Sequence, residues 1–330
     1  GAIAIIHLAY ADVVLETATT HRLPGYVRLY FGAIAGFVSL ASYVFGLAGS
    51  LLAYIVLGGL FLGSLISSLL PALPTITGPL VFFVLGVGIM LRGVRFEGAA
   101  NGILTLLLII AIVVFGVVLI PSASGSLLTG FQSTGLFVPY GVILFSLAGA
   151  AVIPDMRVLL GRERQGSLRR TVFFGSITAA ALYLLFAFAV VGTTGGQTSP
   201  DAISGVAEKM GSGYLLVGAI IGFLAAITSF IPLGNVFQGV LEQDVGFSRN
   251  AAWRVVIGVP MFLYAVGFQD FIRIISVVGI FGIGLESMFI LAMHQRLYRA
   301  KGVLSIPLLL SCLLVLVFIA GIAGEIVRFF

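Results

Sequence analysis

Long apolar runs separated by short polar connections make up most of this chain. A helix that spans a bilayer needs about 20 predominantly apolar residues. Runs near or above that length lie at positions 37–70, 103–120, 171–191, 214–240, 271–293 and 303–326. Shorter apolar runs occupy positions 77–91, 140–160 and 251–266, and positions 1–15 form about half a span. The pattern predicts an all-α polytopic membrane protein with about nine spans plus one partial span.

The composition and charge of the chain are typical of a protein embedded in a lipid bilayer. Of the 330 residues, 60% are hydrophobic and only 9% are charged, which is too apolar for a soluble domain. Basic residues of short loops stay on the cytoplasmic side. Five alternate connections hold 14 of the 17 basic residues: Arg22 and Arg28; Arg92 and Arg95; Arg157, Arg162, Arg164, Arg169 and Arg170; Arg249 and Arg254; Arg296, Arg299 and Lys301. The net charge of +5 therefore reflects topology, and no nucleic-acid partner is expected.

The run at 140–160 is too short for a straight span, and its small residues and proline indicate an interruption of the helix. It reads Leu147-Ala148-Gly149-Ala150-Ala151 and then Ile153-Pro154-Asp155. A membrane helix that opens and restarts exposes backbone N–H and C=O groups, which the bilayer tolerates only beside a cavity. The pattern thus predicts a broken helix that grips the charged groups of a substrate. The alternative is a helix that ends at the proline with ordinary glycine packing.

Several ordered motifs resemble the aromatic amino acid permease family of the amino acid, polyamine and organocation transporter superfamily. They are His21-Arg22-Leu23-Pro24-Gly25-Tyr26, the run from Phe45 to Tyr54 followed by Gly58-Gly59, Pro139 to Phe145 with Ile153-Pro154, Tyr183 to Phe186 followed by Val190-Val191-Gly192, and Thr228-Ser229-Phe230. The resemblance extends from about His7 to Lys301. It implies a LeuT-type fold of five plus five helices in inverted repeats, in which 140–160 is the sixth helix.

The resemblance also implies a division of the chain. Positions 1–330 form one transmembrane transporter domain, with 1–120 the remainder of the first repeat, 138–293 the second repeat and 303–327 an additional C-terminal helix. Position 1 then falls within the second helix of the fold, so the sequence is expected to lack the first helix and its glycine-rich break.

The candidate substrate-binding residues surround the predicted break. Phe145, Ser146, Leu147, Ala148, Gly149 and Ala150 offer N–H groups to a substrate carboxylate and carbonyl groups to an ammonium group. Tyr54 is expected to close over the substrate, although tyrosine is at least as common as a core or interface residue. Alanines in this position leave room for a large side chain.

Two sets of residues are candidates for ion coupling. Ala225, Thr228 and Ser229 share one helix face, where a carbonyl and two hydroxyls suit Na⁺, or the hydroxyls bond back to the preceding turn. Glu286 is the carboxylate farthest from both ends of an apolar run, which makes it a candidate proton carrier or a protonated packing group.

The predicted function is secondary active transport of amino acids, large neutral or aromatic, by alternating access coupled to a Na⁺ or H⁺ gradient. The expected location is a prokaryotic cytoplasmic membrane, with lipid and an amino acid as partners and no cofactor beyond the ion. No nucleophile with a nearby base is evident, so an enzyme is not expected. The alternative is a non-transporting sensor or assembly subunit; the sequence does not fix the oligomeric state.

Three smaller expectations concern the ends of the helices. Asp12 and Glu16 are expected to form structural ion pairs with Arg22 or Arg28. Positions 199–210, with Pro200 near the start, are expected to form a short helix that acts as an outer lid. His7, His21 and His294 are dispersed, and none is expected beside a second ligand.

Overall fold

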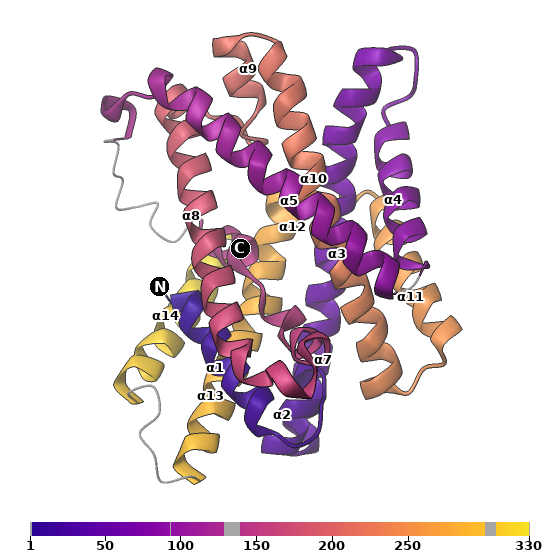
Figure 1. Ribbon diagram of the computed structural model, residues 1–330, viewed down its shortest axis with the longest axis vertical. Helices are drawn as coiled ribbons and strands as arrows, with labels where there is room; N and C mark the ends of the chain where they lie inside the picture. The colour runs from indigo at the N-terminus through magenta and orange to yellow at the C-terminus, as the bar shows by residue number, and fades with distance from the viewer. Residues whose placement is uncertain (1, 93, 129–138, 301–307, 330) are drawn as a thin grey trace.

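Every regular element of the described chain is a helix. The computed structural model describes residues 2–92, 94–128, 139–300 and 308–329 (Figure 1). In its first part the α-helices are α1 (Ala2–Glu16), α2 (Leu23–Phe31), α3 (Ala33–Leu69), α4 (Thr77–Met90) and α5 (Val94–Leu119), followed by 3₁₀ turns η1 (Ile120–Ser122) and η2 (Gly125–Leu128).

The second part contains the interrupted helices. Its elements are α6 (Tyr140–Leu147), η4 (Ala150–Val152), α7 (Ile153–Arg164), η5 (Gln165–Ser167), α8 (Leu168–Thr194), η6 (Gly195–Gln197), α9 (Ser204–Met210) and α10 (Gly213–Val240). They are followed by the π-helical turn η7 (Leu241–Val245), α11 (Arg249–Ala265), α12 (Phe271–Val278), the π-helical turn η8 (Gly279–Gly284), α13 (Leu285–Ala300) and α14 (Leu308–Phe329).

Six helical stretches are long and apolar enough to cross a membrane. They are Ala33–Leu69, Gly98–Ser122, Tyr140–Gly161, Gln165–Gln197, Gly213–Val245 and Phe271–Ala300. Shorter apolar helices lie at Thr77–Met90 and Leu310–Gly324. These stretches confirm an integral, multi-pass membrane protein, while the total of nine spans stays a prediction.

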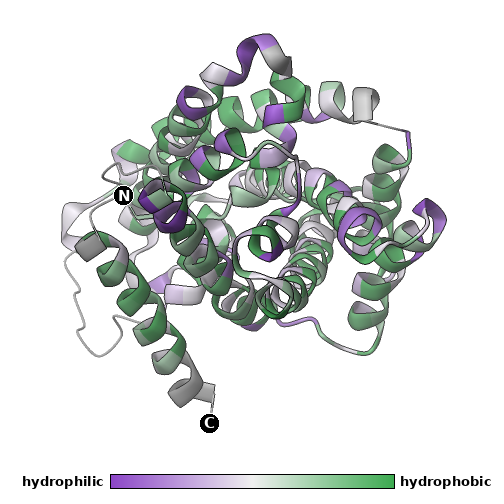
Figure 2. Ribbon diagram, turned by 90° about the horizontal axis from the view of Figure 1, so that it is seen from below, coloured by the Kyte–Doolittle hydropathy of each residue, from purple (hydrophilic) through white to green (hydrophobic). Residues whose placement is uncertain are grey.

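The helices divide into an inner and an outer set. The most apolar windows of α3 and of the α12–α13 stretch are 61% buried, whereas that of the α5 stretch is 17% buried and that of the α8 stretch 11%. In Figure 1, α3 and α10 run side by side through the molecule and α5 crosses in front of them. Figure 2 shows that hydrophobic residues make up most of the helices, at the periphery as well as at the centre. The exposed apolar side chains of α5, such as Leu106, Ile110 and Val114, therefore face the lipid.

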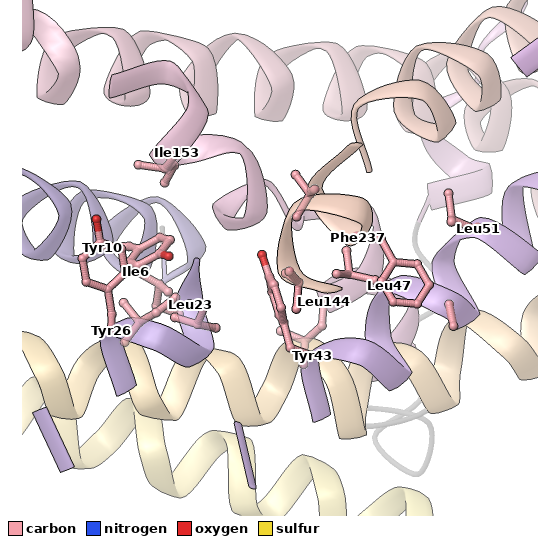
Figure 3. Close-up of a cluster of buried hydrophobic side chains, with 14 of the residues drawn as sticks. Ile6, Tyr10, Leu23, Tyr26, Tyr43, Leu47, Leu51, Leu144, Ile153 and Phe237 are labelled. Carbon is pink, nitrogen blue, oxygen red and sulfur yellow. The ribbon is translucent and has the colours of Figure 1, made fainter. Parts of the chain in front are cut away.

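A buried cluster joins the N-terminal helices to the broken helix. Figure 3 shows Tyr10 of α1 beside Tyr26 of α2, and Tyr43 and Leu47 of α3 beside Leu144 of α6. The rings of Tyr10 and Tyr26 meet edge to face with centroids 6.0 Å apart, a favourable arrangement of aromatic quadrupoles. The cluster anchors α1 and α3 next to the residues that precede the helix break.

Charged pairs tie one end of the bundle together, and they differ from those expected. Arg22 bonds to Asp155 in the first turn of α7 at 2.6 Å, whereas Asp12 pairs with Arg169 of α8 at 3.2 Å. Asp12 also lies 3.3 Å from Nε2 of His294. The prediction that Asp12 pairs with Arg22 or Arg28 and that His294 stands apart was wrong, because α1 packs against α8 and α13.

At the opposite end, α9 is shorter than expected (Figure 1). The predicted helix over 199–210 begins only at Ser204. The Asp201 carboxylate accepts hydrogen bonds from the Ser204 amide, at 3.2 Å, and from the hydroxyls of Ser199 and Ser204. These bonds satisfy the backbone in a turn that precedes the helix, so Pro200 lies outside α9.

Candidate functional site

The helix expected to break does so at the predicted small residues. Helix α6 ends at Leu147, and Ala148 is extended, with φ −65° and ψ 129°. Gly149 follows with φ −152° and ψ 1°, and α7 starts at Ile153 after one 3₁₀ turn. Pro154 fits the first turn of α7 because an N–H there would have no acceptor within the helix. The alternative of a simple helix end is wrong, since a second helix continues beyond the break.

A cavity of about 180 Å³ lies against this break. That is several times the ~30 Å³ that a water molecule occupies in the liquid. Its walls come from α1, α3, the α6–α7 break, α10 and the η8–α13 segment. Of the predicted site residues, it collects Phe145, Ala148, Gly149, Ala150, Tyr54, Thr228, Ser229 and Glu286. Residues from four separate regions of the sequence thus line one cavity.

Three predicted residues lie outside that cavity. Ser146 and Leu147 line a second cavity of about 230 Å³, which α1, the break and α8 enclose and which shares Ala148 and Gly149 with the first. The Ser146 hydroxyl donates to the Ile143 carbonyl at 3.0 Å. Ala225 lines neither cavity; its carbonyl accepts from the Thr228 hydroxyl at 3.2 Å. The break therefore has two faces, one toward each cavity.

Aromatic side chains form part of the first cavity's wall. The rings of Tyr54 and Phe145 lie with centroids 5.7 Å apart and planes inclined by 43°. Tyr54 belongs to α3 and Phe145 to the last turn of α6, so the pair bridges the long central helix and the break. Ile283 and Ile290 add apolar wall from the η8–α13 segment. This wall suits an apolar or aromatic side chain.

Two hydroxyls from α10 face the same hollow. The Thr228 hydroxyl donates to the Leu224 carbonyl at 2.8 Å, one turn earlier, as Thr commonly does within helices. Its oxygen retains lone pairs for a cation, and Ser229 lies beside it on the cavity wall. Sodium coordination by Ala225, Thr228 and Ser229 stays a prediction.

Glu286 contributes a carboxylate to the wall of the same cavity. Its residue is only 8% exposed and belongs to the first turn of α13, directly after η8. A methyl group at Gly46 of α3 would lie 3.4 Å from Glu286 Oε1, which locates the carboxylate close to α3. A buried carboxylate needs a partner, a proton or water, and the cavity offers it access to solute.

His7 is the site residue that the sequence did not reveal. Its side chain lines both cavities and is 8% exposed. The Gly149 amide donates to Nε2 of His7 at 3.1 Å, and Nδ1 of His7 lies 3.0 Å from the Ser176 hydroxyl of α8. A lone histidine in an apolar helix carries no spacing signal, so only the packing of α1 on α8 and on the break reveals it.

The end of the bundle near α9 carries a compact hydrogen-bonded turn. Lys209 donates to the Thr193 carbonyl at 2.6 Å, which ties α9 to the end of α8. Partial burial alone would raise the pKa of the Asp201 carboxyl, but the bonds from Ser199 and Ser204 outweigh it and lower the pKa below its ordinary value. The turn is therefore most stable with Asp201 ionised.

Comparison with known proteins assigns the family. A model of the tryptophan/tyrosine permease family matches residues 3–240, which include the break, His7, Tyr54, Thr228 and Ser229. A search of curated proteins found no match. The family match covers more than two thirds of the 330 residues and supports an amino acid transporter over an enzyme. The chain, with its helix break beside a cavity, therefore belongs to the tryptophan/tyrosine permease family.

Proposed function

We propose that this chain is a secondary active transporter that moves large neutral or aromatic amino acids across a prokaryotic cytoplasmic membrane. It works by alternating access and draws on a Na⁺ or H⁺ gradient. The observation that carries the proposal is the opening of the α6–α7 helix onto a cavity that also holds hydroxyls and a carboxylate. Such a constellation matches the two opposite charges of an amino acid.

Recognition of the substrate uses the break for its charged groups and the aromatic wall for its side chain. The N–H groups that precede α7 meet the carboxylate, with support from the positive end of the helix dipole. Free carbonyls at the end of α6 meet the ammonium group. Tyr54 and Phe145 contact the apolar side chain. A neutral zwitterion enters low dielectric more cheaply than an ion, because both of its charges find partners.

For alternating access we propose a LeuT-type arrangement of two inverted repeats, with positions 1–120 in the first repeat and 138–293 in the second. The Arg22–Asp155 pair connects the start of α2 with the start of α7. Movement of α7 separates this pair and opens the cavity toward the end of the bundle where α2 lies. When the substrate has left, the pair forms again.

Coupling to an ion uses residues of the same cavity. Na⁺ binds near Ala225, Thr228 and Ser229, where oxygen ligands suit a hard cation. Alternatively, Glu286 carries a proton, because the ionised carboxylate is energetically unfavourable inside the membrane when it faces neither water nor a partner. The two couplings predict different dependences of uptake on the imposed gradient.

The test is uptake of radiolabelled L-tryptophan and L-tyrosine by proteoliposomes that contain the full-length protein. Saturable accumulation above the equilibrium level is expected under one gradient and not without it. With a Na⁺ gradient as the driving force, the double substitution Thr228→Ala and Ser229→Ala is expected to raise the Na⁺ concentration for half-maximal uptake severalfold. Uptake that needs no Na⁺ would reject the sodium assignment, and absence of uptake under both gradients would reject the proposed function.

A further inference from the structure

One side chain already occupies the amide that an incoming carboxylate would need. The Gly149 N–H donates to Nε2 of His7, with a separation of 3.1 Å between the nitrogens. A methyl group on Gly149 would lie 3.2 Å from Cε1 of His7, so the imidazole sits directly against the break. The Gly149 amide at the break is thus bonded to His7.

The contact fixes the protonation state of His7. An amide N–H always donates, so Nε2 must present its lone pair and carry no hydrogen. The single N–H of the neutral ring is then on Nδ1, which donates to the Ser176 hydroxyl 3.0 Å away. The ring therefore bonds to Ser176 of α8 through Nδ1 and to Gly149 of the break through Nε2.

We propose that His7 is a proton-dependent carboxylate receptor at the break, an inference that rests on the proposed function. In its neutral form His7 accepts from Gly149 and keeps the amide from the substrate. When a proton from water binds Nε2, that nitrogen becomes a donor and releases the Gly149 N–H. The amide and the imidazolium then both donate to the substrate carboxylate, which binds between them.

The charges around His7 favour this exchange. The titratable side chains that face the two cavities beside His7 are Tyr43 and Tyr54 of α3, Glu286 of α13 and Tyr183 of α8. The cavity residues of α6, α7 and α10 contribute no titratable group. Tyrosines are neutral at ordinary pH, so Glu286 is the one side chain of this set that can carry a negative charge there. The substrate carboxylate, itself an anion, is accommodated when the imidazolium brings its positive charge.

Linkage turns this geometry into a measurable quantity. If the carboxylate prefers protonated His7, then protons tighten substrate binding and substrate binding takes up a proton to the same extent. The affinity for L-tryptophan should then rise as the pH falls, approaching about tenfold per pH unit where His7 is mostly neutral. At fixed pH, binding should take up close to one proton per site.

The deciding variant is His7→Gln, measured by equilibrium binding of radiolabelled L-tryptophan to the full-length protein between about pH 5 and pH 8. The glutamine carbonyl can still accept from Gly149, but it does not titrate in this range. We expect the pH dependence to flatten in His7→Gln and to persist in the matched variant Glu286→Gln. A second variant, Ser176→Ala, removes the acceptor of the Nδ1–H and is expected to shift the pH dependence to lower pH without flattening it.

The outcomes separate this inference from the proposed function. An unchanged pH dependence in His7→Gln, or one that disappears only in Glu286→Gln, overturns the role of His7 and leaves the transporter intact. If His7→Gln does not fold, the Ser176→Ala shift decides, and a pH dependence identical to that of the parent protein counts against His7. Failure of the parent protein to bind or transport L-tryptophan and L-tyrosine at any pH overturns the proposed function itself.

Discussion

Two helices of this protein are interrupted, and they are interrupted in different ways. Between α6 and α7 the backbone leaves the helical conformation at Ala148, so polar groups of the chain face a cavity. Between α12 and α13 the chain widens into the π-helical turn η8 and stays helical, with φ −60° and ψ −40° at Gly279. The first interruption offers backbone groups to a solute, whereas the second alters which way the next side chains face.

The two interruptions also pack against each other. A methyl group on Gly279 would collide with the Gly141 carbonyl, so α6 and η8 approach backbone to backbone. Gly282 meets Gly46 of α3 in the same manner. The glycines of η8 thus permit close helix packing, and Glu286 follows them at the start of α13, where its carboxylate reaches the cavity. Glycine thus lies where the backbone opens onto a cavity at one interruption and permits close helix packing at the other.

The largest expected effect comes from filling the first interruption. Gly149→Leu places a branched side chain where His7 lies within 3.2 Å of a methyl position, and it projects into the cavity. We expect loss of detectable L-tryptophan binding with expression and thermal unfolding close to those of the parent protein. The matched control is Gly258→Leu in α11, where a methyl group meets no atom within 4 Å. Retained binding in Gly149→Leu would remove the break from the substrate site.

The next effect concerns the carboxylate that follows the second interruption. Glu286→Gln keeps the shape and hydrogen-bonding ability of the side chain but cannot carry a proton. If Glu286 couples transport to protons, the variant should bind L-tryptophan but no longer accumulate it under a pH gradient. Proteoliposome uptake and exchange measure this difference. Accumulation at the parent level would clear Glu286 of proton coupling.

A third substitution tests the close packing at the second interruption, the π-helical turn η8. Gly279→Ala forces a methyl group against the Gly141 carbonyl, and overpacking of this kind costs about 1–3 kcal/mol. We expect a lower thermal unfolding temperature in detergent with L-tryptophan affinity unchanged in the folded fraction. Gly88→Ala in α4, where the added methyl meets nothing within 4 Å, provides the control. Equal stability of the two variants would mean that η8 and α6 do not need their close approach.

The smallest effect is expected far from both interruptions. The pKa of Asp201 is lowered, so the folded state binds a proton at this carboxyl less readily than the unfolded state. Its stabilising contribution is present above the unfolded pKa and is lost as the pH falls through the folded pKa. Asp201→Asn should destabilise by about 1 kcal/mol or less, because the carboxyl is partly exposed and acts much like a helix cap. Thermal unfolding of both proteins should converge toward acid pH; a constant difference would contradict the ionised turn.

The sequence predicted the elements of this fold far better than their contacts. Apolar runs located the six spanning stretches with ends that differ by at most seven residues, since lipid exposure demands long apolar segments. The small residues before Pro154 located the break, because they leave the helix little side-chain packing to hold it closed. The sequence did not predict which charged side chains pair at the helix ends. Asp12 lies nearer to Arg22 in sequence than to Arg169, yet the tertiary packing of α1 determined its partner.

The sequence likewise predicts only part of the candidate site, because contacts between distant positions determine the rest. Glu286 stands out in the sequence as a carboxylate far from both ends of an apolar run, Thr228 shares a helix face with Ala225 and Ser229, and Tyr54 is expected to close over the substrate. Tyr54, Thr228 and Glu286 share a cavity with the break. His7 was passed over, because its importance comes from a contact 142 positions away in the chain. The π-helical turn at Gly279–Gly284 was also missed: three glycines in an apolar helix indicate close packing but not the number of residues per turn.

The most direct test of substrate binding at the break is labelling of a cysteine placed within it. Cys312, the chain's single cysteine, is first replaced with serine, and Ala148→Cys, at an exposed position that lines both cavities, is added. The rate of modification by a water-soluble thiol reagent is then measured with and without L-tryptophan. We expect L-tryptophan to slow labelling of Ala148→Cys but not of Gly258→Cys. Equal rates at Ala148→Cys under conditions where the protein binds L-tryptophan would place the substrate elsewhere.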